Sequence, residues 1–441
     1  MKNLKVAILL VFFSFVGFSQ DHFSGISTSS RVGILNGLIN PAEYSNLSKK
    51  LEINLYGTSF NVNNNKIGFS DLTSNSNLQD IIFKENSPVN LSFDGQIVGP
   101  GVAIKLLKWS FALTTKANLK FDLINIDPNI GNAIFNNNVS DQLLNSNSNQ
   151  RLISTSYGEM GFSIARPIID TQKHSISAGI TLKLLFPGSY SNFGLNGLNG
   201  QISTSGNLTT NQPATLNIAY SGNLANSFSN LDDYTKTIFG GLNGVATDFG
   251  FTYKWKDGPR KYKIKVGLAI RNIGSMTFND SNNSSTNYTL NIPTSDPLNL
   301  NTFNNTNNLG NIENILIEKG YLTKIDVQKD FKVNLPTLFS LYSDFKIIPK
   351  IYITGYLQQK LNNDNENNQI TALNIVSVTP RVNLGFFETY VPISNNSISG
   401  TAIGYGFRLG GFYLGSNSII SSLTSNSKQA DIYSGFRWSF L

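Results

Sequence analysis

Residues 245–273 read VATDFGFTYKWKDGPRKYKIKVGLAIRNI, and this stretch decides the fold class. Every second residue from Val245 to Trp255 is apolar, aromatic or threonine, and the alternation resumes after the turn from Tyr262 to Ile270. A period of two residues indicates a β-strand, and a Gly-Pro turn between two such runs predicts a hairpin. Each arm is long enough for the ~9–11 residues with which a tilted strand crosses a bilayer. One apolar face and one mixed polar face are typical of a transmembrane β-barrel.

The same alternation, applied to this hairpin and to neighbouring strands, assigns charged side chains to the lumen. The candidates are Lys116, Glu159, Lys183, Asp248, Lys254, Lys263, Lys265 and Arg271. A lysine facing lipid at mid-bilayer would cost ~2–4 kcal/mol, so these side chains must face the lumen or lie at a rim. Two interpretations stay open: a path for an anionic amphiphile whose head group meets Lys and Arg, or a network of ion pairs that fills the barrel. The lysines beside the turn at 256–260 can also reach lipid head groups.

The N-terminus predicts export. A short basic stretch, an apolar run over 6–18 and small residues before Gln20 have the form of a secretory signal peptide, residues 1–19. Residues 20–48 lack clean alternation and contain the step Asn40-Pro41-Ala42. This segment is expected either to plug the barrel or to form a surface arm in the periplasm. Residues 49–441 are expected to form the barrel, in the outer membrane.

Composition narrows the function classes. The chain has no cysteine and two histidines, and 14% of its residues are charged, against ~25% in typical proteins. The formal charge of +7 is spread along the chain, which gives no support to nucleic-acid binding. His22 and His174 are not placed beside a nucleophile, and no metal-ligand spacing or phosphate-binding loop is present. We therefore predict no enzyme activity, no cofactor and no metal.

Loop lengths predict the topology. Long polar loops are expected at 61–90, 125–149, 187–243 and 277–330, with a shorter one at 362–368, and short turns at 167–173, 256–260 and 345–350. In outer-membrane barrels the short turns are periplasmic and the long loops extracellular. Inside the third loop, residues 201–204 and 215–219 are expected to pair and residues 229–238 to form a short helix. After residue 370, breaks near Pro380 and Gly410 give about fourteen strands, which we favour, whereas unbroken strands give about twelve.

Several segments resemble a known group of barrels. Residues 266–274 (VGLAIRNIG), the NPA step and residues 244–253, with the spacing G-x-x-x-D-x-G-x-x-Y, resemble motifs of the FadL-like barrels, the fatty-acid transporter class. The tail, residues 406–416 and 430–438, resembles a domain family of unknown function within that group. The resemblance implies a fourteen-stranded outer-membrane barrel with an N-terminal plug. It implies nothing about the ligand, because the matched residues belong to wall and plug.

Two functions follow as hypotheses. The barrel transports or binds a hydrophobic or amphipathic small molecule, or it is closed and serves as a docking subunit of a secretion or surface-assembly machine. Expected partners are outer-membrane lipid and either that small molecule or a protein of such a machine.

Overall fold

A computed structural model describes residues 22–29, 32–72, 77–135, 141–225, 239–258, 261–304, 306 and 308–440. The predicted signal peptide and the predicted helix at 229–238 lie outside these residues. None of the helices within the described ranges is long and apolar enough to cross a membrane.

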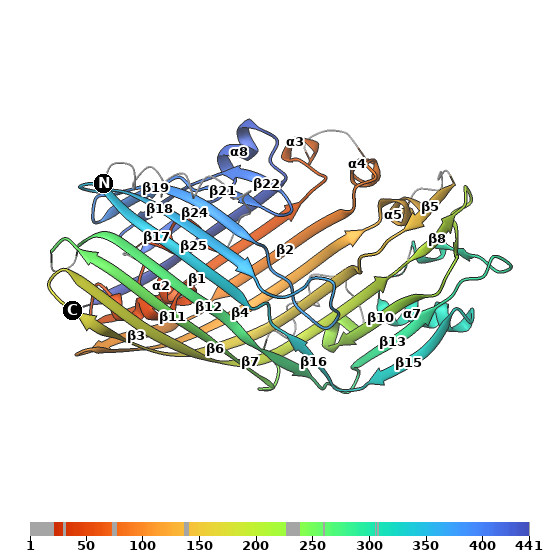
Figure 1. Ribbon diagram of the computed structural model, residues 1–441, viewed down its shortest axis with the longest axis horizontal. Helices are drawn as coiled ribbons and strands as arrows, with labels where there is room; N and C mark the ends of the chain where they lie inside the picture. Colours follow the sequence, from red (N-terminus) through yellow and green to blue (C-terminus); the bar gives the residue numbers. More distant parts are fainter. Residues whose placement is uncertain are drawn as a thin grey trace.

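Across the described residues, fourteen antiparallel strands form one closed barrel (Figure 1). In chain order the wall strands are β1 (Leu51–Asn64), β2 with β3 (Val89–Val98, Gly101–Leu106), β4 (Trp109–Ile126), β6 (Gln150–Asp170), β7 (His174–Asn196), β11 (Gly244–Lys256), β12 (Tyr262–Phe278), β16 with β17 (Phe331–Asn334, Leu338–Ile348), β18 (Ile351–Lys360), β19 (Ile375–Asn383), β20 with β21 (Phe387–Tyr390, Ile393–Asn396), β22 with β23 (Gly400–Ile403, Tyr405–Leu409), β24 (Phe412–Ser416) and β25 (Gln429–Phe440). The last strand closes on the first, with Leu51 opposite Phe440. The prediction of fourteen strands is confirmed.

The break predicted near Pro380 is present but lies slightly later in the chain. β19 continues through Pro380, and the chain turns at 384–386 instead. Pro380 is tolerated because it lies beside the gap between β20 and β21. Its carbonyl accepts a hydrogen bond from Val391 N at 3.1 Å. The N–H that proline lacks would have little part in strand pairing at this gap. The second predicted break, at 410–411, is present between β23 and β24.

Several strands extend further than alternation indicates. β1 continues to Asn64 and β7 to Asn196, so the loops predicted at 61–90 and 187–243 begin later, at 65 and 197. The outer part of β7, residues 190–196, pairs with β10 (Ala214–Ser221), a partner brought in from the loop itself. The first loop contains two short helices, α3 (Phe69–Leu72) and α4 (Leu78–Phe83).

The long loops fold into a cap at the end of the barrel opposite the short turns (Figure 1). β10, β13 (Ser284–Leu290) and β15 (Leu322–Gln328) extend the sheet from β7, and a second sheet contains β5 (Gln142–Asn145), β8 (Asn199–Ile202), β9 (Asn207–Thr210) and β14 (Leu298–Asn299). Helices α5 (Pro128–Phe135) and α7 (Leu309–Glu318) complete the cap. Leu198, Ile202, Ile218 and Ile292 are fully buried in its core.

The predicted pairing of residues 201–204 with 215–219 is wrong. β8 pairs with β5 and β9, whereas β10 pairs with β7 and β13. Both predicted strands exist, but β8 lies between β9 and the distant β5, and β10 lies between β7 and β13.

The segment at 22–47 lies inside the barrel. It contains α2 (Ile34–Ile39) and the 3-10 helix η1 (Pro41–Asn46), and η1 contacts β6, β7 and β11. Ile26, Ile34 and Tyr44 are almost completely buried there. We call residues 22–47 the plug segment.

Candidate functional site in the barrel lumen

The NPA step of the plug segment rests on wall residues that have little or no side chain. Gly179 of β7 and Gly250 of β11 are opposite each other, and Ala165 and Ala269 flank them on the neighbouring strands. A Cβ on Gly179 would lie 2.5 Å from the carbonyl carbon of Pro41, and one on Gly250 would overlap the Asn40 side chain. The close contact of plug and wall therefore requires glycine at these two positions.

Asn40 joins the plug segment to the wall. Its Nδ2 donates to the Phe251 carbonyl at 2.9 Å, and its Oδ1 accepts from the Ala42 amide at 3.0 Å, which caps η1.

Glu43 forms a buried ion pair beside that contact. Its Oε1 lies 2.9 Å from Lys265 Nζ and accepts a hydrogen bond from the Tyr342 hydroxyl at 2.5 Å. Lys265 also donates to the Thr28 carbonyl at 3.0 Å. Burial by itself would raise the pKa of Glu43, but the positive charges of Lys265 and Lys254 and the hydrogen bonds outweigh it and lower the pKa to about 2. Glu43 is therefore ionised at neutral pH.

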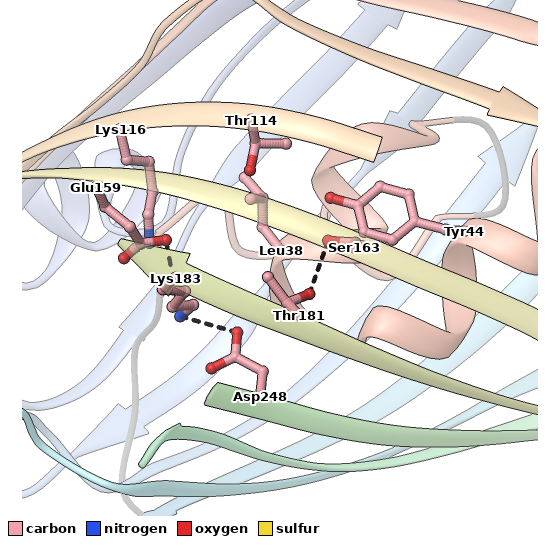
Figure 2. A pocket seen from close by; sticks show the side chains of 10 residues that line it. Leu38, Tyr44, Thr114, Lys116, Glu159, Ser163, Thr181, Lys183 and Asp248 are labelled. Carbon is pink, nitrogen blue, oxygen red and sulfur yellow. Dashed lines mark hydrogen bonds and ion pairs between the residues drawn. The ribbon is translucent and has the colours of Figure 1, made fainter. Parts of the chain in front are cut away.

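A second charged group lies between the plug segment and the wall of β4, β6, β7 and β11, as Figure 2 shows. Lys116 Nζ lies 3.1 Å from Glu159, and Lys183 Nζ lies 2.8 Å from Asp248 and 3.7 Å from Glu159. Asp248 also accepts from the Asn272 amide at 2.7 Å. Four of the eight predicted charges therefore come together, as a chain of alternating sign that we call the charged row.

The space beside the charged row is small. The cavity that it lines with Leu38 and Tyr44 measures about 10 Å³, which is room for about one water molecule. The side chains of the charged row, Leu38 and Tyr44 therefore leave little open space at this position.

The remaining predicted lumen charges have different environments. Arg271 is buried and donates to the Leu38 carbonyl of the plug segment at 3.4 Å. Lys254 is partly buried, with its Nζ 5.9 Å from the Tyr262 ring. Lys263 is exposed and lies over the outward-facing Trp255 ring at 5.3 Å, so its assignment to the lumen is wrong. The register shift between Trp255 and Lys256 interrupts the alternation there, which turns Tyr262 inward and Lys263 outward.

Sequence reasoning missed a third charged group, on the later strands. Arg381 lies 2.7 Å from Asp344 and 3.2 Å from Glu388, and Arg408 lies 3.1 Å from Glu388. Ser29 of the plug segment donates to Glu388 at 2.6 Å. Alternation along β17 could have placed Asp344 inside, but a strand break expected at Pro380 put Arg381 in a turn.

Beyond the charged row, an apolar cluster fills part of the lumen. The Phe278 and Phe331 rings stack, and the Tyr190 ring is tilted against both, with ring centroids 5.3–5.7 Å apart. The same buried cluster contains Ile124, Ile153, Tyr157, Leu185, Ala219, Ala246, Met276, Val333, Leu335 and Ile370. We call the region that these packed side chains fill the apolar chamber.

A loop between β18 and β19, residues 361–374, closes the apolar chamber toward the cap. Its Ile370 is fully buried among the aromatic side chains. The fully buried Arg151 holds the loop through its backbone, donating to the Asp364 carbonyl at 3.0 Å and to the Gln369 carbonyl at 2.8 Å. We call residues 361–374 the mouth loop.

The two histidines lie far apart. His22 Nε2 is 3.0 Å from Asp94 inside the barrel, whereas His174 is exposed at the turn end with its Nδ1 2.9 Å from the Tyr253 hydroxyl. Among the described residues, no group of three or more His, Asp or Glu side chains is arranged to hold a metal ion.

Comparison with known proteins places the chain in a family without a described activity. No curated protein matches it. Among solved structures, the toluene transporter TodX of Pseudomonas putida is 9% identical, over 95% of this chain and 97% of that one, with a TM-score of 0.42. The toluene transporter TbuX of Ralstonia pickettii is 9% identical, over 93% and 95%, with a TM-score of 0.43. Likeness at this level says nothing about what this chain binds.

The resemblance to a domain family of unknown function is confirmed by a match over residues 41–417, which includes the tail piece 406–416, to the family described as "Family of unknown function (DUF5723)". The chain belongs to this family, whose fold here is a fourteen-stranded barrel with its N-terminal segment in the lumen.

Proposed function

We propose that the chain carries a hydrophobic or amphipathic small molecule across the outer membrane, through a lumen that is closed on both sides of an apolar chamber. The observation that carries the proposal is the apolar chamber itself. A structural barrel can fill its interior with ion pairs, as this one does at the charged row, and does not need an aromatic interior for that purpose. Ligand sites for small molecules are predominantly apolar and aromatic, with a few polar groups at fixed positions.

The charges below the chamber suit an amphipathic molecule. Lys120 and the charged row border the apolar side chains, and Lys120 donates to the Thr371 carbonyl of the mouth loop at 3.3 Å. The apolar part of the transported molecule would lie among Tyr190 and Phe278. Its anionic group would replace Glu159 or Asp94 as the partner of a lysine. Passage requires the plug segment and the mouth loop to move, because both ends are filled.

The test adds bulk on one side of a single strand. Ala246 faces the chamber and Val245, its neighbour, is 52% exposed on the outer face. Ala246→Trp would force the packed side chains of the chamber apart, and Val245→Trp adds a similar side chain outside. Two measurements are made. Mass spectrometry identifies small molecules that the protein retains after purification from native membrane. Outer-membrane vesicles are tested for uptake of a labelled long-chain fatty acid and of toluene. We expect retention and uptake in the wild type and in Val245→Trp, and loss in Ala246→Trp. No retention and no uptake in the folded wild type would refute transport.

A second function is supported by the cap. β15 pairs only with β13 among the described strands, and its Ile325 and Val327 are 61% and 54% exposed. An exposed edge strand can add a strand from another protein, which fits a docking subunit of a surface machine. The test is capture of a partner from native membrane. We expect the Ile325→Pro variant to lose capture of the partner. The control variant Leu143→Ser, at another exposed position of the cap, should still capture it. Equal capture by both variants would exclude the edge strand as the contact.

A further inference from the structure

The short turns at one end of the barrel carry a concentration of exposed cations. These are Lys49, Lys50, Lys108, Arg166, Lys173, Lys261, Lys263 and Lys350, which we call the basic arc. Lys49 and Lys50 belong to this end because the Lys105 amide, close to the β3–β4 turn, donates to the Lys50 carbonyl at 2.7 Å. The arc follows the start of β1 and the turns β3–β4, β6–β7, β11–β12 and β17–β18.

Carboxylates do not neutralise the arc. Asp170 and Asp257 lie at the same turns, but each is already paired, with Lys256 and Lys346. No ion pair joins a cation of the arc to a carboxylate within the described residues. The other two turns, 384–386 and 410–411, have no charged residue. The charge therefore covers the larger part of this end and leaves only the two turns nearest β25 uncharged.

Apolar side chains are exposed at the same turns. Leu107 is 96% exposed next to Lys108, Ile168 is 57% exposed near Lys173, and Ile347 is 56% exposed near Lys350. Such side chains are unfavourable in water and favourable at the boundary between head groups and acyl chains. Their position indicates that the turns lie in the head-group layer of the membrane rather than beyond it.

Two tryptophans mark the same boundary. Trp109 lies 4.6 Å from the Arg166 guanidinium, and Trp255 lies 5.3 Å from Lys263 Nζ. Tryptophan is enriched at membrane interfaces, and a cation held over its ring is oriented toward the head groups. Leu268 and Phe251, on the outer faces of β12 and β11, continue the apolar belt from there toward mid-membrane.

We propose that the basic arc binds the phosphates of anionic phospholipids in the leaflet at the turn end of the barrel. Several cations on neighbouring turns face one plane of head groups, and the apolar tips between them enter the acyl boundary. Attraction to an anionic leaflet adds up over such cations and is screened by salt. The site therefore selects anionic over zwitterionic glycerophospholipids around the barrel from β1 to β18.

The test uses full-length protein in nanodiscs that contain equal amounts of phosphatidylglycerol and phosphatidylcholine. The turn-end variant changes Lys108, Lys173, Lys261, Lys263 and Lys350 to glutamine. The matched control changes five exposed lysines at the cap end, Lys84, Lys319, Lys324, Lys329 and Lys332, to glutamine. Native mass spectrometry counts the lipids retained by each protein, and heat-modifiable migration on gels shows that each barrel is folded.

We expect the wild type and the control to retain phosphatidylglycerol preferentially, by about tenfold or more, and the turn-end variant to lose most of that preference. High salt should reduce the preference in the wild type. The proposal is overturned if the wild type has no preference, if the turn-end variant keeps it, or if both variants lose it equally.

Discussion

The two closures of the lumen use different chemistry. The plug segment is held by buried carboxylates: Glu43 pairs with Lys265 at 2.9 Å, and Glu52 pairs with Arg437 at 2.9 Å while accepting from the Ile34 amide at 2.8 Å. The mouth loop is held by Arg151 and Lys120, which donate to its backbone carbonyls, and by the apolar side chain of Ile370.

The difference shows how each closure can open. A buried ion pair is strongly destabilised when one partner is lost, because an uncompensated charge remains. An aliphatic side chain in an apolar chamber can be replaced by another apolar group at little cost. The mouth loop is therefore suited to displacement by a hydrophobic ligand, whereas the plug segment is suited to release by a change in charge.

The largest effect is expected from Glu43→Ala. The variant leaves Lys265 buried without its partner, which should weaken plug docking by about 3–5 kcal/mol. Hydrogen exchange over residues 22–47 measures the loss of protection, and the mouth loop should keep its own. Glu85→Gln is the control, since Glu85 is 70% exposed beside Lys66 and its ion pair should contribute little. Unchanged protection in Glu43→Ala would show that this ion pair does not hold the plug.

Ile370→Ala should release the other closure. Truncating a fully buried isoleucine typically costs about 2–5 kcal/mol, and exchange should rise over residues 361–374 but not over residues 22–47. Ile325→Ala, at an exposed position, should change neither. Equal loss of protection at both ends would mean that the two closures are not independent.

Gly179→Ala should have a smaller effect, on the plug alone. The added methyl would lie 2.5 Å from the Pro41 carbonyl carbon, which backbone movement can relieve only in part, at about 1–3 kcal/mol. Gly355→Ala is the control, because a Cβ there meets nothing within 4 Å. Ion conductance in planar bilayers should rise for the first variant only. Equal conductance would argue against the tight contact.

A fall in pH should act on the plug segment through Glu43, and this effect can be measured in the wild type. The pKa of Glu43 is lowered to about 2, so its ion pair stabilises the plug fully above about pH 4.5 and loses that contribution as pH falls toward 2. Conductance and exchange of the plug should be constant from pH 8 to 5 and rise below about pH 4, and Glu43→Gln should lack this transition. A transition retained in Glu43→Gln would assign it to another carboxylate.

The sequence alone determined the barrel, because alternation with a period of two is a local property of each strand. It identified residues 245–273 as a membrane hairpin and placed Lys116, Glu159, Lys183 and Asp248 toward the lumen, which is where the structure has them. Glycines at 179 and 250 share that inward face, but only the plug explains them.

Tertiary structure decided everything that depends on register between distant segments. A single bulge in β12 turns Lys263 outward. Because β19 continues through Pro380, Arg381 lies next to Asp344. The outer part of β7 extends into the cap because it pairs with β10. The mouth loop is polar over 362–369, and its one buried aliphatic residue, Ile370, has no local pattern that marks it. Such contacts depend on which surfaces meet after the barrel closes, and the period of a single strand carries no information about them.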